Sequence, residues 1–169
     1  MTVHHDEDAA SEATVQELAQ WANQTSIAIR DLTDDSPAPI RMARMVNGFL
    51  IIGVTVNTLH LAAPYDSVRT AAEASYRLVD NTTSHLVNRL GERLVDRYVD
   101  KSEYVRELTV HAELSGRQIS TLRRAVTGLC DLIGEKMLGI WHDVSVPNDL
   151  REAAASANVA TTAIARHLA

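Results

Sequence analysis

The sequence predicts an all-α protein, a bundle of five or six helices with a central apolar helix and one long helix. Apolar residues recur at steps of three and four through most of the chain, which is the spacing of one helix face. All four prolines fall between these periodic segments, where they end helices without interrupting one. Hydrophobic residues make up 46% of the sequence and aromatic residues only 4%, so the core must consist mainly of aliphatic side chains.

Acidic residues are concentrated at the beginning of the chain. Residues 1–35 contain eight acids and one base, for a formal charge of −7, and the rest of the chain carries +1. We expect residues 1–13 to be an acidic flexible tail and residues 14–169 to form a single helical domain. Thr14 and Glu17 are spaced as a capping box, which predicts that the first helix starts at Thr14.

The second periodic segment is unusually apolar, since the 21 residues from Met45 to Tyr65 carry no formal charge. A stretch of this length is typical of a buried central helix, of a membrane span or, at its β-branched centre, of a buried strand. Its polar side chains, among them Asn57 and His60, need internal partners, which a protein core supplies more easily than lipid. We therefore favour the buried helix, with a membrane span through 45–65 as the alternative.

After Pro64 the pattern predicts one long helix over about 68–99, extending towards Leu114, with a kink or break near 100–103. Arg89, Arg93 and Arg97 are each followed three residues later by an acid, a spacing that stabilises a continuous helix.

Two further helices are expected, one after Gly116 and one after Pro147. The last is rich in alanine and buries little area, so we expect it to be weakly held and to need a partner chain to cover it. Apolar seams on the first helix and on the helix after Gly116 are candidates for self-association through coiled-coil-like packing. The seam residues are Val15, Leu18, Ala22, Ile29, Ile119, Leu122, Val126, Leu129 and Ile133.

Residues 108–124 resemble a helix-turn-helix, in which the second helix would present polar side chains to a DNA groove. No acid lies between Glu113 and Asp131, so this segment is locally basic. Glu113 stands where the turn usually has glycine, and an ordinary helix hairpin is the preferred interpretation. The candidate DNA-contacting residues are Arg117, Gln118, Ser120, Arg123 and Arg124.

The sequence contains none of the spacings typical of common catalytic or metal sites. There is no Glu-x-x-His pair, and the single cysteine, Cys130, lies among apolar neighbours that predict a core position. We therefore expect no catalytic residue, no metal and no cofactor, and a protein that is not an enzyme.

The function we expect is that of a non-enzymatic, cytoplasmic helical assembly or interaction protein whose partner is itself, as a homo-oligomer, or another helical protein. The alternatives are a DNA-binding regulator acting through 108–124 and a single-pass membrane-associated protein acting through 45–65.

Overall fold

The computed structural model describes the backbone of residues 2–33, 35–99 and 113–169 and the side chains from residue 12 onwards. Every regular element in these ranges is an α-helix, which confirms the predicted all-α bundle. The helices are α1 (Thr2–Arg30), α2 (Ala38–Ala62), α3 (Asp66–Leu90), α4 (Glu92–Tyr98), α6 (Gly116–Trp141) and α7 (Asn148–Leu168).

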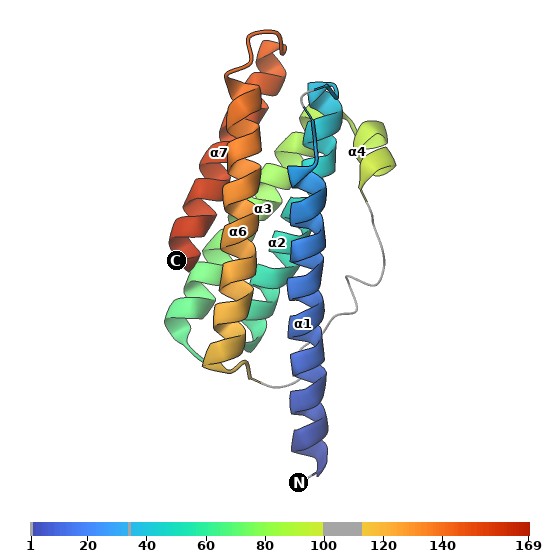
Figure 1. Cartoon of the computed structure of the whole chain (residues 1–169). Helices are drawn as coiled ribbons and strands as arrows, with labels where there is room; N and C mark the ends of the chain where they lie inside the picture. Colours follow the sequence, from blue (N-terminus) through green and yellow to red (C-terminus); the bar gives the residue numbers. More distant parts are fainter. Residues whose placement is uncertain (1, 34, 100–112) are drawn as a thin grey trace.

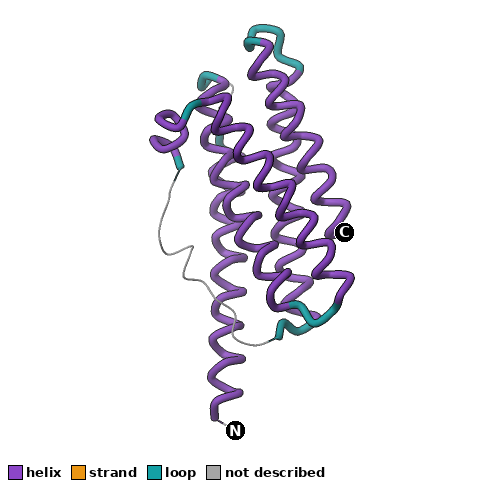
Figure 2. The backbone as a smooth tube through the Cα atoms, turned by 180° about the vertical axis from the view of Figure 1, so that it is seen from behind, coloured by secondary structure: helices purple, strands orange, loops and turns teal. Residues whose placement is uncertain are grey.

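Five long helices lie side by side, and the short α4 packs against α2 and α3 at one end (Figure 1). Helix α6 packs against α1 on one side and α7 on the other, and α3 closes the bundle by contacting α7. Helix α2 contacts α1, α3 and α6, so it is the shared centre of the fold, as expected for the uncharged segment. The view from behind shows the same helices lying side by side (Figure 2).

The central helix is buried on most of its surface by residues of its own chain. Fully covered side chains along it include Met42, Phe49, Ile52, Val56 and Leu59. It is also the one helix in the described ranges that is long and apolar enough to cross a membrane. However, 61% of its most apolar 18-residue stretch is buried inside the protein. Residues 38–62 therefore form a helix and not the alternative strand, and the apolar surface of this helix is mostly covered.

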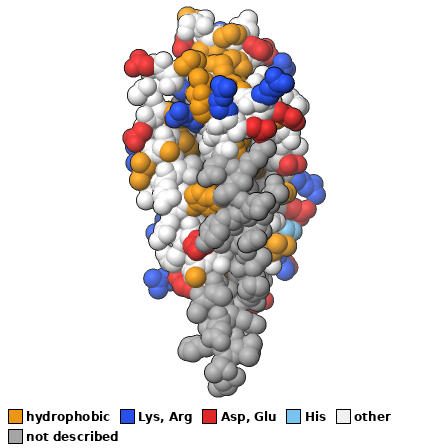
Figure 3. Space-filling model, turned by 90° about the vertical axis from the view of Figure 1, so that its right-hand side faces the viewer, with side chains coloured by type: hydrophobic (Ala, Val, Ile, Leu, Met, Phe, Trp, Pro, Cys, Tyr) orange, Lys and Arg blue, Asp and Glu red, His pale blue; other side chains and the backbone are white. Residues whose placement is uncertain are grey.

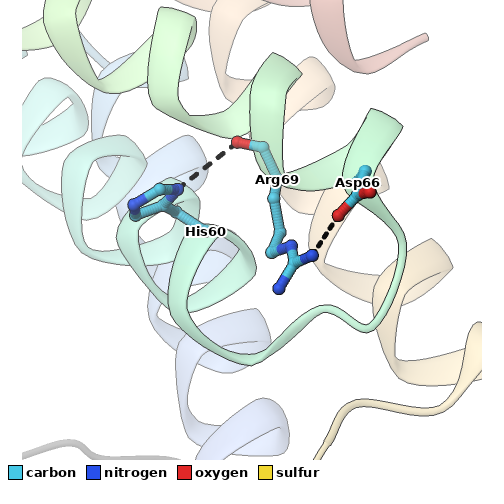
Figure 4. A network of polar contacts seen from close by, with 3 residues as sticks. All are labelled: His60, Asp66 and Arg69. Carbon is cyan, nitrogen blue, oxygen red and sulfur yellow. Dashed lines mark hydrogen bonds and ion pairs between the residues drawn. The ribbon is translucent and has the colours of Figure 1, made fainter.

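Polar side chains of α2 mostly find partners within the chain. The hydroxyls of Thr55 and Thr58 donate to the carbonyl oxygens one turn earlier, and the Asn47 amide donates to the Tyr98 carbonyl oxygen at 2.9 Å. His60 is half-buried and not part of the core, with Nδ1 3.4 Å from the Arg69 carbonyl oxygen (Figure 4). Asn57 differs, because its exposed side chain has no hydrogen-bond partner among the described residues.

Prolines and one serine mark the helix boundaries where the sequence places them. Pro37 and Pro147 precede the first residues of α2 and α7, and Pro64 lies between α2 and α3. Ser115 caps α6 in a reciprocal capping box, since its hydroxyl accepts from the Gln118 backbone N–H and the Gln118 side chain accepts from the Ser115 N–H.

The predicted start of the first helix is wrong. Helix α1 begins at Thr2, so Thr14 lies inside the helix and does not cap it. Residues 2–13 contain neither Gly nor Pro and include several Ala and Glu, which are strong helix formers. A helix nucleated by the buried seam from Val15 onwards can therefore extend backwards through them.

The single long helix predicted over 68–99 is also wrong. Gly91 has φ of 90°, a conformation that side chains with a Cβ rarely adopt, and it ends α3 so that α4 starts in a new direction. Arg89 and Glu92 consequently belong to different helices, and the charge spacing that suggested continuity does not apply across Gly91. The break expected near 100–103 lies outside the described residues.

Helix α7 needs no partner chain to cover it. Its face of small residues, including Ala154 and Ala157, is fully buried against α6 and α3. Gly134 of α6 allows this close approach, since a Cβ there would lie 2.8 Å from the Thr161 hydroxyl oxygen. The Asn158 amide also donates to the Gly134 carbonyl oxygen at 2.8 Å, which ties the two helices together.

Two glycines of α6 provide a matched test of this packing. Gly134→Ala adds a methyl against Thr161, and overpacking costs roughly 1–3 kcal/mol. Gly128→Ala points into open space and should stabilise the helix by about 0.5–1 kcal/mol. We expect urea denaturation to place Gly134→Ala below Gly128→Ala by about 2 kcal/mol in the free energy of unfolding; equal stability would contradict the close α6–α7 approach.

Candidate interaction surface

The two predicted self-association seams are internal. All nine residues are buried within the single chain, with no more than 3% of any of them exposed. Helices α1 and α6 pack against each other, so the seam of one helix covers the seam of the other. The prediction that these residues contact a second copy is therefore corrected: periodicity identified the right contact surfaces, but their partner is in the same chain. The residues are Val15, Leu18, Ala22, Ile29, Ile119, Leu122, Val126, Leu129 and Ile133.

Lys136 lies three residues after Ile133, where the spacing of the α6 seam would place another apolar residue. Its ammonium group donates to the Leu32 carbonyl oxygen at 3.2 Å, just beyond the end of α1. Arg41 holds the same connection from α2, because its Nε donates to the Ser36 carbonyl oxygen at 2.9 Å. Both cations line a cavity of about 250 Å³ together with the carboxylates of Glu135 and Asp143, so the lining charges balance and favour no ionic ligand.

Two of the five candidate DNA-contacting residues, Gln118 and Arg123, already form hydrogen bonds within the chain. Gln118 completes the α6 capping box and also donates to the Glu12 carboxylate at 2.8 Å, which lowers the pKa of Glu12 together with a hydrogen bond from Gln16. Arg123 donates to the carbonyl oxygens of Leu168 and Ala169 at the end of α7, at 2.8 and 2.5 Å.

The other three candidates, Arg117, Ser120 and Arg124, are exposed on α6. Glu12 lies close enough to Arg117 for the arginine's charge to help lower the pKa of that carboxyl, so the patch is not purely basic. The first helix of the proposed motif, residues 108–112, lies outside the described residues.

Cys130 is a core residue, as the sequence indicates. It is 1% exposed, and burial, aided by the neighbouring Asp131 charge, raises the pKa of its thiol to about 12. A thiol with that pKa is almost entirely protonated at neutral pH, and the thiolate is the reactive form.

A surface groove lies between α2 and α3. It has a volume of about 230 Å³, and its floor includes buried Phe49 and Val79 with Gly53 between the helices. Tyr76 and Asp80 of α3 form one rim, and the Thr83 hydroxyl, also in the lining, is buried without a hydrogen-bond partner among the described residues. The base of the groove is therefore apolar, and its side contains one hydroxyl group without a hydrogen-bond partner among the described residues.

The other wall of this groove belongs to an exposed strip of α2, which we call the outer stripe and define as Leu50, Val54, Asn57 and Leu61. Their spacing of four, three and four residues keeps them on one helix face. Leu50 and Val54 are partly buried at the groove, Asn57 is exposed, and Leu61 is 73% exposed. This stripe is not evident from the sequence, because the surrounding residues of α2 are nearly all apolar and hide the spacing.

Apolar groups also reach the surface elsewhere in the described residues. Tyr65, four residues after Leu61, and Tyr76, at the groove, are both exposed. Val159 of α7 and Val144, which precedes that helix, are exposed as well. Figure 3 shows one side of the molecule, on which apolar side chains gather near the upper end beside basic ones. The outer stripe is distinguished from isolated exposed apolar residues by its regular spacing and by the groove beside it.

No family model, curated protein or solved structure matches this chain.

The arginine contacts predict unequal effects of two neighbouring substitutions. Arg123→Ala removes charge-assisted hydrogen bonds to the end of α7 and should lower the free energy of unfolding by about 1 kcal/mol. Arg124→Ala removes an exposed side chain and should change it by less than about 0.5 kcal/mol. Thermal or urea unfolding checks the pair, and an Arg123→Ala protein as stable as Arg124→Ala would refute the structural role.

Burial of the thiol predicts slow labelling of the native protein. A thiol-specific reagent at pH 8 should modify Cys130 at least about a hundredfold more slowly in the folded protein than in denaturant, because only about 1 in 10⁴ molecules carries the thiolate at a pKa of about 12. Stoichiometric labelling of the native protein within the time needed for the unfolded one would show that this part of α6 is accessible.

Proposed function

We propose that this protein is a non-enzymatic, cytoplasmic helical assembly protein that associates with a second copy of itself through the outer stripe of α2 and the adjoining α2–α3 groove. The observation that carries the proposal is the exposure of Leu61 on the most apolar helix of the chain, in register with Leu50 and Val54. On this helix, which is otherwise largely sheltered from water, Leu61 stays uncovered within its own chain, while Leu50 and Val54 are partly buried.

Self-association requires the combined burial of several side chains of the outer stripe and the groove, because one side chain contributes too little free energy. Burying one Leu side chain contributes about 1.5–3 kcal/mol, whereas association costs at least about 4 kcal/mol in lost translational and rotational freedom. Leu61 alone cannot offset that cost, but the outer stripe with Tyr65 and Tyr76 can exceed it. The resulting complex should form in a concentration-dependent manner.

The two alternative functions have less support in the geometry. DNA binding would rely on Arg117, Ser120 and Arg124 alone, because Gln118 and Arg123 already have partners. Membrane insertion of α2 would expose to lipid the faces that now pack against α1, α3 and α6. We therefore propose that α2 remains in the bundle, and recovery of the protein in solution without detergent would support this.

The proposal is tested by measuring solution mass over a wide range of protein concentration, by light scattering or sedimentation. The wild-type protein should shift from the 18.5 kDa monomer towards a dimer. Leu61→Glu places a charge in the contact and should raise the dissociation constant at least about tenfold, since 1.4 kcal/mol suffices for that change. Val159→Glu, at a 63% exposed apolar residue of α7, is the matched control and should leave the dissociation constant unchanged.

A wild-type protein that stays monomeric at the highest concentrations would overturn the proposal. An association weakened equally by both substitutions would also count against it, because the contact would then not be specific to α2. Circular dichroism of each variant verifies that the helices are retained.

A further inference from the structure

We draw no further inference here: the strongest candidate, the α2–α3 groove together with the exposed Leu61 of α2, belongs to the surface already proposed for self-association, and nothing among the described residues shows what covers it.

Discussion

The fold depends on sheltering one long uncharged helix from water. Helix α2 can be covered only if neighbours approach it closely on several sides, and Gly48 is where this is most evident. A Cβ at Gly48 would lie 2.5 Å from Ile133 of α6 and 3.1 Å from Ile29 of α1, so three helices meet at a residue without a side chain. The seams of α1 and α6 are consequently directed inward, and the core has no need of a second chain.

Because α2 packs against α1, α3 and α6, mainly its outer face remains accessible to solvent. Asn47 is tied to the end of α4, and Thr55 and Thr58 bond to their own helix, so the polar groups of α2 are largely satisfied. Asn57 is exposed and has no hydrogen-bond partner among the described residues, and Leu61 is apolar and exposed. This contrast within a single helix is the physical basis for proposing a contact role for its outer face.

Periodicity in the sequence predicted the helices, the central place of α2 and the core position of Cys130, because these follow from local spacing and burial. It could not predict which chain would cover the seam of Val15 and Leu18, since an apolar stripe has the same pattern in a core and in an oligomer. It also treated Gly91 as part of a helix, because one glycine in a charged pattern does not reveal a positive φ. The outer stripe required coordinates, because solvent exposure decides which of several apolar faces is free.

The contact between α6 and α7 illustrates how a helix poor in large side chains can still be held firmly. Alanines at the interface, Gly134 and the Asn158 amide bring the two backbones close together, so dispersion and hydrogen bonding contribute more than the area of each side chain suggests. Heat capacity of unfolding follows the apolar area that becomes hydrated. Release of α7 therefore adds comparatively little to that heat capacity, and its attachment weakens less on cooling than that of the aliphatic core around α2.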